Sequence, residues 1–296
     1  MTGPEAKSNS TGNEGGTGGP TACRIILGAQ LRRLREQAGI SRSEAGYSIR
    51  SSESKISRLE LGRVGFKERD VADLLTMYGV YDERARESLL RLVAQSKEAG
   101  WWRRYNDLLP YWFSEYVGLE ESASRIQTFE LQYVPGLLQT EDYARAVASH
   151  GQPGATEEKR RRTELRMRRQ KILTHPGAPR LWTVIDESAL RRPIGGSAVM
   201  RAQLDALLEW TTMPHIALQV LPYERSGHAA EGAFTILRFA EPEIPDIVYI
   251  EYLVGALYLD KLDEIERYSR AMDRLAVDAE SISRSRELIK KIRAEI

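Results

Sequence analysis

The stretch from Ser41 to Gly62 constrains the fold most, because it reads as two short helices separated by a tight turn. Ser41 stands three positions before Glu44, the capping-box spacing in which each side chain satisfies a free backbone donor at a helix start. Ser52 can cap a second helix, which Gly62 then ends. The spacing therefore predicts one helix after Ser41, a break, and a second helix over residues 52–61.

Further helices flank this pair on both sides. Before Gly39, apolar residues recur three or four apart, at Leu27, Leu31, Leu34 and Ala38. The same periodicity returns after the pair, at Val71, Leu74, Leu75 and Tyr78 and then at Leu89, Leu90, Leu92 and Val93. We therefore predict a bundle of about five short helices over residues 23–99.

The second helix of the pair has a buried side and an outward side. With Ile56 and Leu59 turned inward, the helical period places Ser54 and Arg58 on one outward stripe, with Ser57 beside them. Helix-turn-helix proteins use such a pair to hold one helix in the major groove of DNA. We thus predict base contacts from four residues: Glu53, Ser54, Ser57 and Arg58.

Arg58 is the strongest base-reading candidate, because an arginine can donate two hydrogen bonds to the O6 and N7 atoms of guanine. Glu53 either accepts from a cytosine amino group or merely complements the helix dipole. Basic and hydroxyl side chains near helix ends are better placed to contact phosphates, which set the register of a protein on DNA. The predicted phosphate contacts are Arg42, Ser52, Lys55 and Arg63.

The distribution of charge agrees with this interpretation. The whole chain has a formal net charge of +1, yet residues 24–69 hold eleven Lys or Arg against five Glu, an excess of six positive charges. A local basic excess is typical of nucleic-acid-binding surfaces. Spacing and charge alone still leave open a plain three-helix packing unit.

The string GISRSEAGYSIRSSESKISRLELGR resembles the Cro/C1-type (Xre) helix-turn-helix family, over roughly residues 27–80. The resemblance implies that Ser41 and Arg42 open the supporting helix and that Gly46 takes the small-residue position. It also implies that Ile56 and Leu59 belong to the core and that Glu60 and Gly62 close the recognition helix. Arg50 stands where the family usually has the turn glycine, and Gly46 stands where alanine is commoner. Because a left-handed non-glycine residue costs on the order of 1 kcal/mol, we expect a local change in turn geometry.

A second domain, residues 100–296, is predicted from a change of composition after Gly100. Its first part holds seven aromatic residues, at Trp101, Trp102, Tyr105, Tyr111, Trp112, Phe113 and Tyr116. Helices are predicted at about 114–130, 140–149, 156–174 and 200–210 and from Leu257 to the end, and β-rich runs at 181–186, 216–221, 233–239 and 247–251. The sequence therefore predicts a fold that is mainly α with α+β. The N-terminal domain has five helices, and the C-terminal domain is α+β with a small, mostly antiparallel sheet.

Three segments of the second domain leave alternatives open. VPGLLQT, residues 134–140, is either a helix connection or part of a ligand or partner groove. LRRPIGG, residues 190–196, is either a surface loop or a contact for an anion or a partner. Residues 159–169 hold seven Lys or Arg that could touch DNA, but glutamates at pairing distances favour a solvated helix.

The second domain resembles an actinobacterial domain of uncharacterised function, found behind this helix-turn-helix in regulators called Scr1-like or antitoxin-like. The matching strings are YVGLEESASRIQTFELQYVPGLLQTEDYARA, DESALRRPIGG, MRAQL, IALQVLP, GAFTILRF, DIVYIE and LYLD, over about residues 102–282. The resemblance implies a cytoplasmic, dimeric regulator that is often encoded beside a small partner protein that it binds.

Several other classes of protein are disfavoured. Cys23 is the single cysteine, so no intrachain disulfide or thiolate-rich zinc site can form, and no apolar run approaches the roughly 20 residues of a membrane helix. The four histidines lack ligand spacing, and of these only His228, in a glycine-flanked loop, would merit a test. We expect no enzymatic activity, cofactor, metal or membrane partner. Residues 1–22, rich in Gly, Ser, Thr and Asn, predict a disordered tail.

Three functional hypotheses follow. The first is a homodimeric, sequence-specific transcriptional regulator that binds double-stranded DNA in the cytoplasm. The second is an antitoxin-like protein that binds a small partner protein and regulates its own gene, with an aromatic and Pro-Gly-rich surface at residues 101–138. The third is a small-molecule-responsive regulator with a pocket in the α+β domain.

Overall fold

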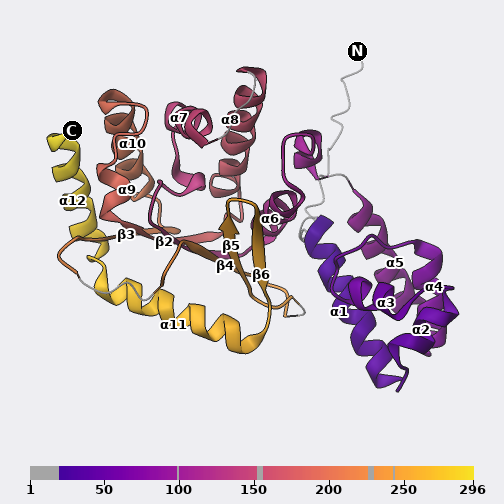
Figure 1. Ribbon diagram of the computed structural model, residues 1–296. Coiled ribbons are helices and arrows are strands. Elements are labelled where there is room, and N and C mark those ends of the chain that lie inside the picture. Colours follow the sequence, from indigo (N-terminus) through magenta and orange to yellow (C-terminus); the bar gives the residue numbers. More distant parts are fainter. Residues whose placement is uncertain (1–19, 99, 152–155, 226–229, 243) are drawn as a thin grey trace, which may run out of the picture.

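The computed structural model describes residues 20–296 except 99, 152–155, 226–229 and 243. The tail predicted for residues 1–22 lies outside the described residues, apart from its last three residues, which are helical. Figure 1 shows an all-helical body built from the first part of the chain and a larger body in which helices cover a β-sheet.

The N-terminal body is the bundle of five helices that the periodicity predicted. Its helices are α1 (Pro20–Gln37), α2 (Arg42–Ser48), α3 (Glu53–Glu60), α4 (Glu68–Met77) and α5 (Glu83–Lys97). Leu27 and Leu31 of α1 pack with Ala45 of α2 and with Ile56 and Leu59 of α3, and all five are buried. The inward stripe of the second helix of the pair is therefore confirmed.

The aromatic segment after Gly100 is largely interior rather than an open surface. It forms a short 3-10 helix, η1 (Trp101–Tyr105), and then α6 (Tyr111–Ser122). Trp102 and Tyr105 are buried with Val117 in a cluster of their own. Tyr111 is 82% exposed, Trp101, Trp112 and Phe113 are partly buried, and Tyr116 is buried, so the surface expected at residues 101–138 is interrupted by rings that pack in the interior.

The described residues of the larger body form a mixed sheet of six strands in the order β3-β2-β1-β4-β5-β6. The strands are β1 (Arg125–Glu130), β2 (Arg180–Asp186), β3 (Ile216–Leu221), β4 (Phe234–Arg238), β5 (Ile247–Tyr252) and β6 (Gly255–Leu259). Strand β1 pairs in parallel with β2, and β2 with β3, whereas the pairings β1–β4, β4–β5 and β5–β6 are antiparallel. Antiparallel pairings are thus only a narrow majority.

Helices cover both faces of this sheet (Figure 1). On one face lie η2 (Gly136–Leu138), α7 (Glu141–Gly151), α8 (Thr156–Gln170), η3 (Lys171–Leu173), α9 (Glu187–Arg191) and α10 (Ser197–Trp210). Along the other face runs α11 (Leu262–Asp278), whose Met272 and Leu275 pack against Phe129 of β1 and Val248 of β5. The last helix, α12 (Ile282–Glu295), packs against α10 and β3.

Two strands were not predicted. The helix expected at 114–130 ends at Ser122, and β1 begins at Arg125. Four successive residues of β1 are buried on both faces of the sheet, so its sequence lacks the alternation that marks a half-buried strand. Strand β6 was included in a helix expected from Leu257 onwards, which begins instead at Leu262.

Helix α6 joins the two bodies. It packs against α1 of the N-terminal body, and a Cβ added at Gly118 would lie 2.2 Å from the Thr21 hydroxyl of α1. Other side chains of α6, including Tyr116 and Glu120, face the larger body. The connection is therefore a packed contact as well as a covalent link.

Candidate nucleic-acid interface

The two short helices are fixed at their ends by the predicted caps. The Ser41 hydroxyl accepts from the Glu44 backbone N–H at 3.2 Å, and the Glu44 carboxylate accepts from the Ser41 N–H at 2.8 Å. The Ser52 hydroxyl accepts from the Lys55 N–H at 3.2 Å. These bonds satisfy backbone donors at helix starts, so the direction in which α3 leaves the turn is well defined.

The turn between α2 and α3 keeps left-handed backbone geometry without a glycine. Arg50 has a φ of +53° and is the one non-glycine residue with positive φ in the described part of the chain. Gly46 packs closely on the next segment, since a Cβ there would meet the Ser51 carbonyl oxygen at 2.9 Å. The departures at these two positions are thus accommodated by strain at Arg50 and close packing at Gly46.

A buried ion cluster ties α1, α2 and α3 together. Glu60 of α3 has a side chain only 3% exposed, and its carboxylate accepts from the Arg35 Nη2 and from the Arg42 Nε, each at 3.0 Å. Hydrogen bonding to Glu60 raises the pKa of Arg35. Glu60 therefore contributes to stability, and a predicted phosphate contact, Arg42, is already engaged in an ion pair.

The predicted base-reading residues lie on the side of α3 that the rest of the chain leaves open. Glu53, Ser54 and Arg58 are exposed, and Ser57 is half-buried. The Arg58 Nε makes only a weak contact of 3.4 Å with the Ser54 carbonyl oxygen of its own helix. Figure 1 shows the larger body on the α1 side of the bundle, so it does not cover α3. The four residues therefore share an open side of the helix, and their contact with DNA stays a prediction.

The predicted phosphate contacts separate into two pairs. Ser52 and Arg63 are exposed at opposite ends of α3. Lys55 is half-buried, with its Nζ 3.0 Å from an Asp70 carboxylate oxygen, and Arg42 is 37% exposed. The structure places all four at the ends or flank of α3, and their contact with phosphate stays a prediction.

Two exposed residues beside α3 were not among the predicted contacts. Tyr47 of α2 is 88% exposed, and Arg50 is exposed at the turn. Tyr47 could have been found, because it directly follows the buried Ala45 and Gly46 and so must point outward. Arg50 was noted only as a departure from the family pattern.

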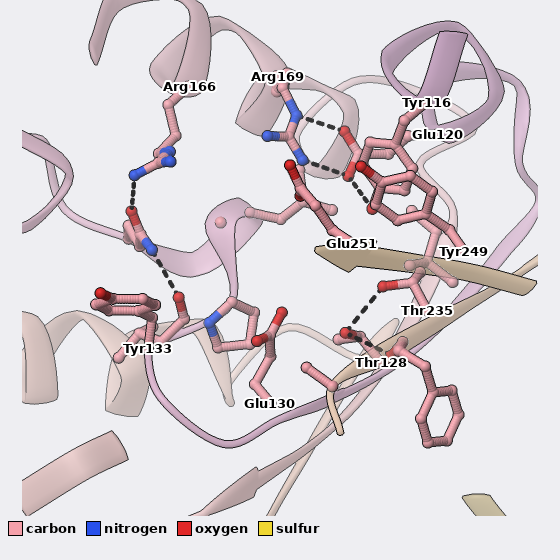
Figure 2. Close-up of a pocket in the computed structure, with 18 of the residues that line it drawn as sticks. Tyr116, Glu120, Thr128, Glu130, Tyr133, Arg166, Arg169, Thr235, Tyr249 and Glu251 are labelled. Atoms are coloured by element: carbon pink, nitrogen blue, oxygen red, sulfur yellow. Dashed lines mark hydrogen bonds and ion pairs between the residues drawn. The ribbon is translucent and has the colours of Figure 1, made fainter. Parts of the chain in front are cut away.

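A second candidate site is a cavity of about 230 Å³ in the larger body (Figure 2). Arg166 and Arg169 reach into it from α8, Glu130 from β1, and Tyr249 and Glu251 from β5. The VPGLLQT segment forms part of its wall through Val134, Pro135, Gly136, Leu137 and Gln139. That segment is therefore more than a helix connection.

Only some of the charged groups in this cavity are paired. Arg169 donates two hydrogen bonds to the Glu120 carboxylate, Nε to Oε2 at 2.7 Å and Nη2 to Oε1 at 2.8 Å. Tyr116 also donates to Glu120, at 2.9 Å. Burial, and then the nearby negative charge of Glu251, raise the pKa of Glu130 to about 8.

An apolar groove of about 450 Å³ adjoins this cavity. It is formed by Tyr133, Val147 and residues 192–196, and the first two also line the charged cavity. The LRRPIGG segment thus belongs to a recess rather than to a plain surface loop. In the basic run at 159–169, Arg160 pairs with Glu157 on the exposed surface, whereas Arg169 is buried.

Of the histidines whose side chains the structure describes, neither His175 nor His215 lines the cavity or the groove. His215 contacts the Leu173 carbonyl oxygen, and His228 lies outside the described residues. Within the described part of the chain, no group of three or more histidine, cysteine or acidic side chains is arranged to hold a metal ion.

Comparison with known families agrees with this division into two bodies. Residues 26–89 match a family described as helix-turn-helix domain, and residues 113–291 match a family described as Domain of unknown function (DUF5753). No curated protein and no solved structure matches the chain. Among the described residues, no helix is both long enough and apolar enough to cross a membrane.

Proposed function

The chain belongs to the family described as Domain of unknown function (DUF5753), and, because a helix-turn-helix domain precedes that domain, we propose that it is a sequence-specific transcriptional regulator. The helix-turn-helix match supports DNA binding in general. The observation that carries the finer proposal is the outward side of α3, where Ser54 and Arg58 are exposed while Glu60 holds the helix to α1 and α2.

In this proposal α3 enters the major groove with its outward side, which carries Ser54 and Arg58, toward the bases. Arg58 donates two hydrogen bonds to a guanine, worth about 1–3 kcal/mol of discrimination against the wrong base. Glu53, Ser54 and Ser57 contact neighbouring base edges. Ser52 and Arg63, at the two ends of the helix, contact phosphates and so fix the register.

We propose further that the protein acts as a homodimer. Two copies related by a twofold axis would place two α3 helices in successive major grooves, about 34–36 Å apart. The DNA site would then contain two related half-sites about one helical turn apart. Sedimentation of the full chain with a DNA duplex gives the stoichiometry, and one copy per site would contradict the proposal.

Fluorescence anisotropy tests the role of Arg58. The full chain is titrated into duplexes from the region upstream of its own gene, and the tightest is compared with a shuffled duplex at constant salt. Arg58→Ala should weaken the specific complex about 5- to 150-fold and the shuffled complex much less. Arg84→Ala, which removes an exposed arginine from α5, is the matched control and should change neither affinity. Equal losses on both duplexes would remove Arg58 from base reading.

A second candidate function is the binding of a partner protein. The tip of the β5–β6 hairpin exposes a contiguous apolar segment, with Tyr252 53%, Leu253 96% and Val254 83% exposed. Exposed apolar patches commonly mark protein interaction sites. A small partner encoded beside this gene should co-purify with the full chain and be lost from a Leu253→Ser, Val254→Ser variant; absence of co-purification would count against this function.

A further inference from the structure

The charged cavity of the larger body has the chemistry of a ligand site. We propose that it binds a small organic cation, an ammonium or amidinium compound that carries an aromatic or other apolar body. The proposal concerns the larger body alone and does not depend on DNA binding. Its basis is an excess of carboxylates, a buried hydroxyl without a partner, and an aromatic wall.

The cavity is lined by more carboxyl groups than guanidinium groups, three glutamates against two arginines. Glu120 is neutralised by Arg169 through two hydrogen bonds. Arg166 donates to the Gln139 side chain at 3.0 Å and forms no ion pair with a described residue. Glu130 and Glu251 likewise form no ion pair within the part of the chain that the structure describes. Once Glu130 is ionised, two uncompensated carboxylates face one uncompensated arginine, and a positively charged ligand would supply the missing counter-charge.

Tyr249 supplies an independent indication of a ligand. Its side chain is 5% exposed and lines the cavity, and its hydroxyl is buried without a hydrogen-bond partner of good geometry. A buried hydroxyl without a well-placed partner is unfavourable until a partner arrives. An ammonium or amidinium N–H of the ligand would be that partner, because the hydroxyl lies beside the Glu251 carboxylate.

The wall around these carboxylates is aromatic. Tyr116 stacks on Tyr249 with ring centroids 4.2 Å apart, and Phe113 stacks on Tyr116 at 5.6 Å. Tyr133 stands at the boundary with the apolar groove, which it also lines. Aromatic faces attract cations, and the groove beyond Tyr133 can hold an apolar body. The ligand class is therefore amphiphilic: a cationic group in the cavity and an apolar portion toward the groove.

Binding of such a cation should release a proton. Burial raises the pKa of Glu130 to about 8, so this carboxyl is largely protonated in the empty cavity at neutral pH. An ammonium beside it stabilises the carboxylate form, and the proton then leaves. The other ionisable groups that face Glu130 are Glu251, Arg166 and Arg169, with Tyr116, Glu120 and Tyr249 behind them. Affinity for the cation should consequently rise between pH 6.5 and 8.5.

Isothermal titration calorimetry of the full chain, without DNA, tests this proposal. The probes are phenethylamine and benzamidine as cations, 2-phenylethanol as a neutral compound and phenylacetate as an anion. We expect at least one cation to bind about tenfold or more tightly than phenylacetate. Its affinity should be greater at pH 8.5 than at pH 6.5. Equal or tighter binding of phenylacetate, or no pH dependence, would overturn the proposal.

A variant with both free carboxyls neutralised locates the site. Glu130→Gln with Glu251→Gln should weaken binding of the cation about tenfold or more, whereas the control Glu266→Gln, on an exposed position of α11, should leave it unchanged. Circular dichroism checks that the double variant is folded. If it is not, the pH dependence of the unaltered chain still decides the question. Unchanged affinity in a folded double variant would place the cation elsewhere and overturn the proposal.

Discussion

Removal of the Glu60 carboxylate should loosen the helix-turn-helix more than any surface change. In Glu60→Ala, the Arg35 guanidinium, whose side chain is 8% exposed, would lose both of its hydrogen bonds to α3 and keep only a longer contact of 3.5 Å with the exposed Glu36 carboxylate. Removing one partner of a buried pair typically costs about 3–5 kcal/mol. Arg42 is 37% exposed and can be hydrated, so its loss adds little.

Hydrogen–deuterium exchange of the full chain measures this effect locally. A loss of about 3–5 kcal/mol corresponds to exchange in α2 and α3 faster by roughly two to four orders of magnitude. The control Glu87→Ala removes an exposed glutamate of α5 and should change exchange by less than one order of magnitude, since surface substitutions cost about 0.5 kcal/mol or less.

A compensated variant separates lost charge pairing from lost packing. Arg35→Met with Glu60→Leu replaces the pair by apolar side chains and should recover most of the protection, because no buried charge is then left unpaired. If Glu60→Ala exchanges like Glu87→Ala, the ion pair does not hold α3, and the reasoning is refuted.

Three other substitutions test the packing and the cavity. Gly28→Ala should lower the free energy of unfolding by about 1–3 kcal/mol, although alanine is the better helix former, because its Cβ would lie 2.5 Å from the Leu59 carbonyl oxygen. Gly118→Ala, between α6 and α1, should also lower the free energy of unfolding. The control Gly232→Ala, with open space around its Cβ, should be close to neutral in denaturant titrations. A loss of stability in Gly232→Ala as large as in the other two variants would contradict this account of the packing. The unfolding temperature should fall as the pH rises from about 5 to 8, because the folded chain keeps on Glu130, with its pKa raised to about 8, a proton that the unfolded chain releases near 4.5. Glu130→Gln should reduce this slope, and a slope identical to that of the unaltered chain would show that Glu130 is not the group responsible.

The N-terminal body could be predicted because its signals are local. The capping box of Ser41 and Glu44, the cap at Ser52 and the stripe of Ile56 and Leu59 all lie within a few residues of the helices they define. The sequence did not show which basic residues are already held in ion pairs, because Glu60, the acidic partner of Arg42, lies 18 positions away.

The second site could not be predicted, because it depends on contacts between distant segments. Glu130 and Glu251 come together only through the pairing of β1 with β4 and of β4 with β5. Strand β1 was itself missed, since burial on both faces removes the alternating pattern. A groove was one of the alternatives considered for the VPGLLQT segment, and an anion or partner contact was one for the LRRPIGG segment. Neither sequence indicates that glutamate and arginine side chains from β1, β5 and α8 line the cavity beside them.

Dimethyl sulfate footprinting on the DNA duplex that binds most tightly tests the central claim most directly, because the reagent methylates guanine N7 in the major groove and adenine N3 in the minor groove. Protein bound through α3 should protect guanine N7 atoms in two clusters about one helical turn apart, and Arg58→Ala should restore reactivity at one guanine of each cluster. Protection of adenine N3 alone, or a footprint that Arg58→Ala leaves unchanged, would contradict major-groove reading by this helix.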